Sequence, residues 1–531
     1  MPQSPKLRHG WIRLVSVLSV VCAVVCAALL GLTSVAVGSE ASVAAGRAPV
    51  VRTAAGLVQG KTAGTVDEYL GIPYAAPPVG ALRWRPPQPA ASWRGVRLAT
   101  KFGPHCAQPG SFFGVASTSE NCLYLNVFAP AGSAGRDLPV MVWVHGGSLL
   151  VGESNDYNPA SLVKDGVIVV TINYRLGALG FLADSALAAR SGGPSGDYGL
   201  LDQQAALRWV KRNVHAFGGN PRNVTLFGES AGGLSVLSQL VSPGARGLFQ
   251  RAIVESGSYD LTQQSQAAAD AAGATFAASV GCTSNTAACL RRLPVSEIID
   301  HEDLGYTPNV DAAVLPESIK TALASGRFSH VPVVIGTNHD EYRLFVGLDT
   351  LIGSPVTAAN YQAMIGSTLG VSAATAAAVA GKYPLSAYSS PSVALGAVGT
   401  DAIFACPALT AEDLLSRYTP TYAYEFNDEH APELYLAPAG FPYGAAHASE
   451  IQYLFDVSNT PYPGHLTAAQ QRLAQTMRRY WTNLAKVGDP APSWPRFTAA
   501  RERTLSLVPP GPRIETDYAA EHHCGFWAAM E

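Results

Sequence analysis

Continuous apolar runs alternate along the chain with segments of helical periodicity. Short runs rich in β-branched residues are typical of strands buried on both faces of a sheet. Such runs lie at residues 140–144, 167–171, 224–227, 252–254 and 331–335. Residues 200–217 instead repeat their apolar positions at helical spacing, and further helical segments separate the later runs. This alternation predicts an α/β fold with a large, mostly parallel central sheet and helices on both faces.

Weaker patterns extend the prediction toward both ends of the chain. Residues 69–74 and 82–87 mix apolar residues with Pro and Gly, which favours short edge strands and loops. Two alanine-rich tracts, at about residues 263–323 and 344–415, predict helical insertions that cover the functional site. The same criteria predict strands at 123–128 and 421–426, a long amphipathic helix at 467–487 and a short edge strand at 505–507.

Composition describes a globular protein with a large interior. Of the 531 residues, 48% are hydrophobic and 14% are charged, and the formal net charge is −3. No basic face or tail is present, so nucleic acid is not expected as a partner. There is no internal repeat or hinge-like linker, so residues 50–531 are expected to form one large domain with insertions.

The N-terminus has the features of an export signal. Lys6, Arg8 and Arg13 precede an apolar run over residues 14–32, and small residues follow up to Gly38. We expect residues 1–38 to be a secretory signal peptide and residues 39–49 a disordered lead, so that the mature protein is secreted. The alternative is an uncleaved membrane anchor, because the run is close to a spanning length.

Cysteine usage agrees with an exported protein. Two of the eight cysteines, Cys22 and Cys26, lie inside the signal segment. The remaining six form an even set, which favours disulfides. Spacing suggests local closures for two pairs and leaves the last two cysteines to each other: Cys106–Cys122, Cys282–Cys289 and Cys406–Cys524. No Cys-x-x-Cys or His/Cys cluster suggests a zinc site.

A G-x-S-x-G pentapeptide, Gly228-Glu-Ser-Ala-Gly232, ends the apolar run at 224–227 and begins a helical pattern. A serine at the tip of a sharp strand-to-helix turn is the signature of a nucleophile elbow. The glycines avoid collisions with the neighbouring strand and helix, and Ser230 Oγ is exposed above the sheet. The motif also occurs by chance, so the rest of the chain must supply the partners that a serine nucleophile needs.

Donors for an oxyanion are suggested by the loop His145-Gly-Gly-Ser148, which directly follows the strand at 140–144. A glycine-rich loop at a strand end exposes backbone N–H groups, which a developing alkoxide requires. The N–H of Ala231, at the start of the helix after Ser230, would be a further donor. The alternative is an ordinary turn between a strand and a helix.

The acid and the base should follow the serine along the chain, each at the end of a strand. The strand at 331–335 is followed by both Asp340 and Glu341, and spacing alone does not choose between them. Among the later histidines, His447 is favoured because small residues on both sides let its imidazole approach another loop closely. His522 and His523 lie near the C-terminus and are expected to be surface residues.

Several sequence blocks resemble those of type-B carboxylesterases, the family that includes cholinesterases and bile-salt-type lipases. The resemblance extends from about Tyr69 to Trp527 and includes the elbow. Its other blocks lie, in the family's order, at residues 70–78, 120–126, 173–181, 199–203, 217–221 and 524–527. It implies the α/β-hydrolase fold, with helical insertions over the active site.

The resemblance also implies a role for individual residues. It gives Ser230 as the nucleophile, Glu341 rather than Asp340 as the acid, and His447 as the base. It places the oxyanion donors at Gly147, Ser148 and Ala231. It also places a second layer of polar residues around the triad, at Glu229, Ser256 and Glu450. It supports the three disulfide pairings. No metal or organic cofactor is expected.

Two departures from the family pattern affect the expected specificity. Ser148 and Leu149 stand where the family has a third glycine and an aromatic residue. The backbone donors survive that change, but a serine side chain there would strain the loop or narrow the acyl site. In the loop between Cys106 and Cys122, the only aromatic residues are Phe112 and Phe113, and the tryptophan that cholinesterases use for choline is absent. A preference for choline esters is therefore not expected.

The sequence thus predicts a secreted serine carboxylesterase that acts on small-molecule or lipid esters through an acyl-enzyme on Ser230. One alternative is a lipase or sterol esterase that acts on long-chain esters. Another is a non-catalytic, cholinesterase-like binding protein, although such relatives typically lose the serine or the histidine. Membrane contact is expected only if the N-terminal segment is uncleaved, and the sequence does not indicate an oligomeric state.

Overall fold

The computed structural model describes residues 48–530 except 192, 303–304, 458–459 and 463. The predicted signal segment, 1–38, and the predicted lead up to residue 47 lie outside the described residues. The first element, strand β1 (Val50–Thr53), begins shortly after them.

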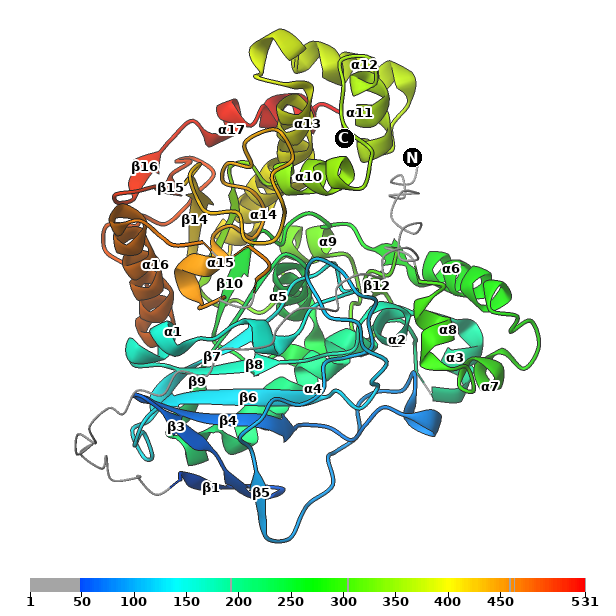
Figure 1. Cartoon of the computed structure of the whole chain (residues 1–531), viewed down its shortest axis with the longest axis vertical. Coiled ribbons are helices and arrows are strands. Elements are labelled where there is room, and N and C mark those ends of the chain that lie inside the picture. Colours follow the sequence, from blue (N-terminus) through cyan, green and yellow to red (C-terminus); the bar gives the residue numbers. More distant parts are fainter. Residues whose placement is uncertain (1–47, 192, 303–304, 458–459, 463, 531) are drawn as a thin grey trace, which may run out of the picture.

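One eleven-stranded sheet organises the described chain (Figure 1). Seven central strands run parallel to one another, from β15 (Thr504–Leu507) across to β8 (Ile168–Ile172), and each strand outside them is antiparallel to its inner neighbour. Across the sheet the order is β16 (Arg513–Glu515), β15 (Thr504–Leu507), β14 (Thr421–Phe426), β13 (Val333–Asn338), β10 (Arg251–Glu255), β9 (Gly219–Glu229), β7 (Leu138–Val144), β8 (Ile168–Ile172), β6 (Tyr124–Pro130), β4 (Val66–Pro73) and β3 (Lys61–Ala63). This is the α/β-hydrolase fold, as the resemblance implied.

Both faces of the sheet are buried, which explains the continuous apolar runs. Val142 on β7 belongs to one hydrophobic core, and its neighbour Trp143 belongs to the other. The first core is completed by helices α4 (Tyr198–Asn213) and α5 (Ala231–Val241), and the second by α16 (Ala468–Val487). Because successive side chains on a strand point to opposite faces, nearly every position of a doubly covered strand is apolar or small.

The two alanine-rich tracts are helical, as predicted. The first contains α6 (Gln266–Ser279), α7 (Thr286–Leu290), α8 (Val295–Ile299) and α9 (Ile319–Ala324). The second contains α10 (Arg343–Leu351), α11 (Tyr361–Leu369), α12 (Ala373–Lys382), α13 (Pro391–Gly399) and α14 (Cys406–Ser416). In Figure 1, α10–α13 stand above one end of the sheet, and α6–α8 lie to its side.

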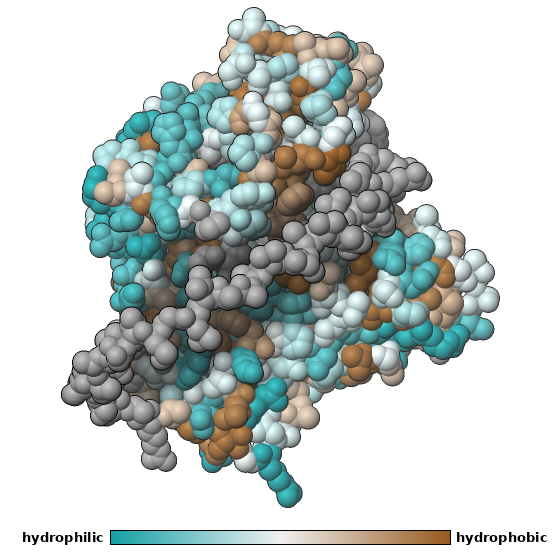
Figure 2. Space-filling model, in the orientation of Figure 1, coloured by the Kyte–Doolittle hydropathy of each residue, from teal (hydrophilic) through white to brown (hydrophobic). Residues whose placement is uncertain are grey.

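A π-helical turn, Thr400–Ala405, joins α13 to α14. Such turns are rare and often mark functional sites. The continuous helix Pro391–Ser416 is long and apolar enough to span a membrane by length and composition, but 61% of its most apolar window is buried inside the protein. That burial is typical of a core helix in a folded domain. The face seen in Figure 2 mixes hydrophilic and hydrophobic residues, with brown residues gathered toward the middle of the view.

Disulfides join Cys106 to Cys122, Cys282 to Cys289 and Cys406 to Cys524. The last one ties helix α18 (Cys524–Ala528) to the start of α14.

Two predictions about the sheet margins were wrong. The strand at residues 69–74 is not an edge strand, because it belongs to β4, which lies between β6 and β3. The strand at 505–507 is not an edge strand either, because β16 adds one more antiparallel strand outside β15. The outermost strands β3 and β16 have three residues each and are largely polar, too short for a hydrophobic pattern to reveal.

Candidate active site

Ser230 lies in a strained turn between β9 and α5. Its backbone has φ 55° and ψ −122°, a conformation that non-glycine residues rarely adopt. The turn is tight because a Cβ on Gly228 or on Gly232 would lie 2.6 Å or 2.0 Å from the carbonyl oxygen of Val144 on β7. The Ser230 N–H donates to the carbonyl of Glu255, which fixes the turn against β10. The sequence from 228 to 232 therefore forms the predicted elbow.

The loop after β7 lies directly against the elbow. Val144 pairs with Gly228, so both strands end at the same level of the sheet. A Cβ on Gly146 would lie 3.0 Å from the Ser230 Cβ. Gly147 has φ 95°, and a Cβ there would lie 2.1 Å from the carbonyl oxygen of Val151, so only glycine fits.

Backbone donors are available on both sides of this contact. In the loop 145–149, the N–H groups of Gly147 and Ser148 donate to no acceptor within the described chain. Ala231 begins α5, where the first N–H groups of a helix have no acceptor within the helix. Ser148 and Leu149 both have φ 58°, so the residues that replace the usual glycine and aromatic are held in the left-handed region. The loop thus keeps its amides while accepting the strain that the sequence predicts.

His447 and Glu341 are hydrogen-bonded to each other. Glu341 follows β13, and its Oε2 accepts a hydrogen bond of 2.5 Å from Nδ1 of His447. The other carboxylate oxygen of Glu341 accepts the N–H of Asn338 at 2.8 Å, so the carboxylate is held from two sides. The His447 N–H donates to the carbonyl of Glu341, which joins the two loops through the backbone as well.

Asp340 was the other candidate for the acid. Its carboxylate contacts a different set of residues. One of its oxygens contacts Arg343 at 2.8 Å and His339 at 3.1 Å, and the other accepts the N–H of Ala445 at 2.9 Å. Gly444 leaves room for this contact, since a Cβ there would lie 2.1 Å from Asp340 Oδ2. Asp340 therefore braces the loop that carries His447 without touching the imidazole.

The second nitrogen of His447 faces the elbow. Nε2 lies 3.2 Å from Oε1 of Glu229, the residue before Ser230. The imidazole packs against the rings of Phe345 and Phe404, with centroids 5.2 Å and 5.1 Å away. Both aromatic residues were missed at the sequence level, because nothing in their spacing relates them to a histidine far along the chain.

Three buried carboxylates set the charge around the imidazole. Burial favours the neutral acid and raises the pKa of Glu229 to about 7 and that of Glu450 to about 8. Burial alone would lower the pKa of His447, but the negative charges of Glu229 and Glu341 outweigh it and raise the pKa to about 9. The site therefore stabilises the imidazolium form of His447.

The other members of the predicted second layer lie behind this group. Glu450 accepts a 2.5 Å hydrogen bond from the Asn338 side chain, which also donates to the carbonyl of Ala446. The hydroxyl of Ser256 is buried and has no hydrogen-bond partner within the described chain. The same is true of Oε1 of Glu450. Asn338 was not singled out from the sequence, although it contacts both Glu341 and Glu450.

The prediction that His522 lies on the surface was wrong. Its side chain is 3% exposed and contacts the carboxylates of Asp401 and Glu425. His523 is partly exposed, and its ring contacts the backbone carbonyl of Ala520. No pattern in the sequence distinguishes the two histidines, because burial of His522 depends on how the C-terminal segment packs against β14 and the π-helical turn.

Within the described part of the chain, no group of three His, Cys, Asp or Glu side chains is arranged to hold a metal ion. The arrangement at the elbow instead combines a strained serine, a hydrogen-bonded imidazole–carboxylate pair and free backbone amides. Such an arrangement suits acyl transfer to a hydroxyl.

Comparison with known proteins points to one family. The model of the carboxylesterase family matches residues 47–527. The para-nitrobenzyl esterase of Bacillus subtilis (strain 168) is 37% identical over 486 residues, which covers 86% of this chain and 94% of that protein. The cocaine esterase of Homo sapiens is 34% identical over 509 residues, with 88% of each chain covered. The acylcarnitine hydrolase of Mus musculus is 34% identical over 487 residues, covering 84% of this chain and 85% of that protein.

Solved structures agree with the sequence matches. A PNB esterase structure superposes with a TM-score of 0.77 at 33% identity and covers 90% of this chain and 99% of its own. A thermophilic PNB esterase gives the same TM-score, identity and coverage.

Proposed function

This chain belongs to the carboxylesterase family of carboxylic ester hydrolases, and we propose that it hydrolyses small, soluble carboxylic esters through an acyl-enzyme on Ser230. The observation that carries the proposal is the 2.5 Å hydrogen bond between Glu341 and His447, beside a serine held in a strained elbow. The matches to a para-nitrobenzyl esterase and to a cocaine esterase support small esters as the substrate class.

In the proposed mechanism, His447 removes the proton of Ser230 as Oγ attacks the ester carbonyl. This requires one contact beyond those described above, a hydrogen bond from Ser230 Oγ to His447 Nε2, which we expect to form when substrate binds. Glu341 holds the imidazole through Nδ1 and stabilises the imidazolium that forms. The imidazolium then protonates the leaving alcohol, and water hydrolyses the acyl-enzyme by the same route.

The negative charge on the carbonyl oxygen needs donors that are already in place. We assign them to the N–H groups of Gly147, Ser148 and Ala231, which come from two segments that meet at the elbow. Because these amides are fixed before the reaction, they stabilise the tetrahedral intermediate without reorganising. Ser148 carries its side chain next to two of these donors, so it is the residue that we expect to limit the size of the acyl group.

A fluorophosphonate probe tests the proposal directly. The probe reacts with a serine only when a base activates it, so we expect a single phosphonyl adduct on the peptide that contains Ser230, and loss of ester hydrolysis in proportion to labelling. The stoichiometry is read by mass spectrometry. A protein that hydrolyses p-nitrophenyl acetate but carries its adduct on another serine would contradict the assignment, and a protein that does neither would be a non-catalytic relative.

The pH dependence should follow His447. The base form is required, and the raised pKa of about 9 means that kcat/KM should rise with pH until about that value. Glu229→Gln removes a negative charge that stabilises the imidazolium, so the pKa of His447 should fall and the acidic limb should move down by roughly 1 pH unit. The matched control is Glu317→Gln, which removes a carboxylate paired with Arg327 outside the site. If the acidic limb of the kcat/KM profile does not move in Glu229→Gln, the charge of Glu229 does not affect the pKa of His447.

We also propose that the protein is secreted. The three disulfides are compatible with an oxidising compartment. The signal peptide itself lies outside the described residues, so the test is mass spectrometry of the exported protein, which should begin after Gly38 and lack Met1.

A further inference from the structure

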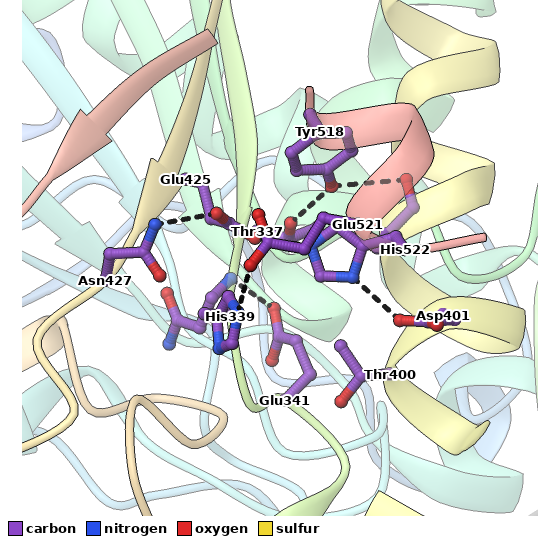
Figure 3. Close-up of polar contacts among 12 residues, drawn as sticks. Thr337, His339, Glu341, Thr400, Asp401, Glu425, Asn427, Tyr518, Glu521 and His522 are labelled. Carbon is purple, nitrogen blue, oxygen red and sulfur yellow. Dashed lines mark hydrogen bonds and ion pairs between the residues drawn. The ribbon is translucent and has the colours of Figure 1, made fainter. Parts of the chain in front are cut away.

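His522 lies between two buried carboxylates (Figure 3). Its Nδ1 is 2.7 Å from Asp401 Oδ1, and its Nε2 is 2.6 Å from Glu425 Oε1. Asp401 belongs to the π-helical turn, and Glu425 belongs to β14. The imidazole of His522 therefore joins the π-helical turn of the second alanine-rich tract to the central sheet.

This geometry favours a charged imidazole. A neutral imidazole carries one N–H, so one of the two carboxylates would face a nitrogen lone pair. An imidazolium donates to both and compensates their negative charge in a dry environment, where an unpaired charge is costly. The neighbouring carboxylates outweigh burial and raise the pKa of His522 to about 10, in agreement with this geometry.

The π-helical turn that His522 holds contacts the residue after Glu341 and the ring of His447. Thr400 Oγ1 accepts the N–H of Tyr342, the residue after Glu341, at 3.0 Å. Phe404 packs on the His447 ring. A displacement of this turn would therefore act on the backbone beside Glu341 and on the face of the imidazole.

The C-terminal segment that carries His522 is itself held in place by further contacts. Cys524, two residues on, is disulfide-bonded to Cys406 directly after the π-helical turn. Trp527 Nε1 donates to the hydroxyl of Tyr383, which in turn donates to Asp401 Oδ2 at 2.7 Å. On the sheet side, the second oxygen of Glu425 accepts the Asn427 side chain at 2.7 Å.

We propose that His522 is a positioning residue for ester hydrolysis: by clamping Asp401 to Glu425, it fixes the turn that orients the Glu341–His447 pair. The inference rests on the proposed function of that pair. His522 touches neither substrate nor reacting atoms, so its removal should lower kcat and leave KM for p-nitrophenyl acetate nearly unchanged. A misplaced base is costly, and we expect a fall in kcat of roughly 10- to 100-fold.

The test compares three variants with a matched control. His522→Gln has a similar size but no charge, whereas His522→Lys keeps a cation that can donate to both carboxylates. Thr400→Val removes the acceptor for the Tyr342 N–H without changing the ion cluster, and it remains informative if His522→Gln does not fold. His330→Asn is the control, because that exposed histidine contacts the backbone carbonyl of Gly326 and neither Asp401 nor Glu425. Thermal melting verifies that each variant is folded.

We expect His522→Gln and Thr400→Val to lose kcat with little change in KM, and His522→Lys to retain more activity than His522→Gln. Proton NMR should show the downfield resonance of the His447 Nδ1–H in the wild type and in His330→Asn, and its weakening in His522→Gln. Folded His522→Gln and Thr400→Val proteins with wild-type kcat and an unchanged resonance would overturn the proposal. So would equal losses in His522→Gln and His522→Lys, because the clamp depends on charge.

The two proposals fail in different ways. If Ser230→Ala retains hydrolysis, the proposed catalytic serine is wrong whatever the His522 variants do. If Ser230→Ala is inactive and His522→Gln is indistinguishable from wild type, only the positioning role is wrong.

Discussion

Ser230→Ala should lower kcat roughly 10⁴- to 10⁶-fold and leave the fold intact. The change removes only the attacking oxygen. The imidazole–carboxylate pair and the free amides remain, so a small residual rate from binding and oxyanion stabilisation is expected. Alanine also fits the site, because Ser230 is already packed against Gly146 and its Cβ is retained.

The measurement is kcat for p-nitrophenyl acetate, with thermal melting to establish folding. Ser238→Ala is the matched control: it makes the same replacement two turns further along α5, where the hydroxyl donates to the carbonyl of Leu234. Ser238→Ala should keep wild-type turnover. A Ser230→Ala protein within tenfold of wild type would remove the basis for the acyl-enzyme.

Glu341→Gln should lower kcat by roughly 10⁴-fold. An amide can still occupy the space, but it no longer stabilises an imidazolium, and its NH₂ group favours the wrong imidazole tautomer. The Asn338 N–H would also lose a charged acceptor. KM should change little, because Glu341 is completely buried behind His447 and does not contact substrate.

Asp340→Asn provides the comparison, since it is the same kind of change at the adjacent residue. The amide would keep the size of the side chain that accepts the Ala445 N–H, and the imidazole keeps its own carboxylate, so the loss should be far smaller than in Glu341→Gln. Equal losses in the two variants would mean that the pair described here is not the one that works in catalysis.

The sequence predicted the sheet well because its central strands are buried on both faces. Nearly every residue of β7 or β13 must then be apolar or small, and a continuous run results that a turn or a surface helix would not contain. The elbow was predictable for a related reason: Gly228 and Gly232 are required by contacts with the backbone of β7. The outermost strands of the sheet were less predictable, because a polar strand of three residues shows no alternation of apolar and polar positions.

The choice between Asp340 and Glu341 could not be made from the residue pattern. Both carboxylates follow the same strand, and only the three-dimensional contacts distinguish the one that bonds to His447 from the one that bonds to Ala445 and Arg343. The resemblance to a family chose Glu341; this residue contacts His447 whereas Asp340 does not, and its role as the acid stays a prediction.

His522 illustrates a second limit. A histidine next to another histidine near a chain end has no hydrophobic period and no motif, so it suggests a solvated residue. Its burial is a property of three segments that meet in the fold: the π-helical turn, β14 and the disulfide-bonded terminus. The π-helical turn has no pattern either, because its sequence continues the apolar character of the helices on both sides.

The parts of the site are also made in a fixed order during synthesis. The nucleophile elbow emerges first, Glu341 next, then His447, and the segment that holds His522 and Cys524 comes last of all. A nascent chain that ends before residue 522 lacks the imidazole that joins Asp401 to Glu425. A ribosome-bound intermediate that stops before residue 522 therefore lacks the contact that we propose to hold the π-helical turn against the sheet.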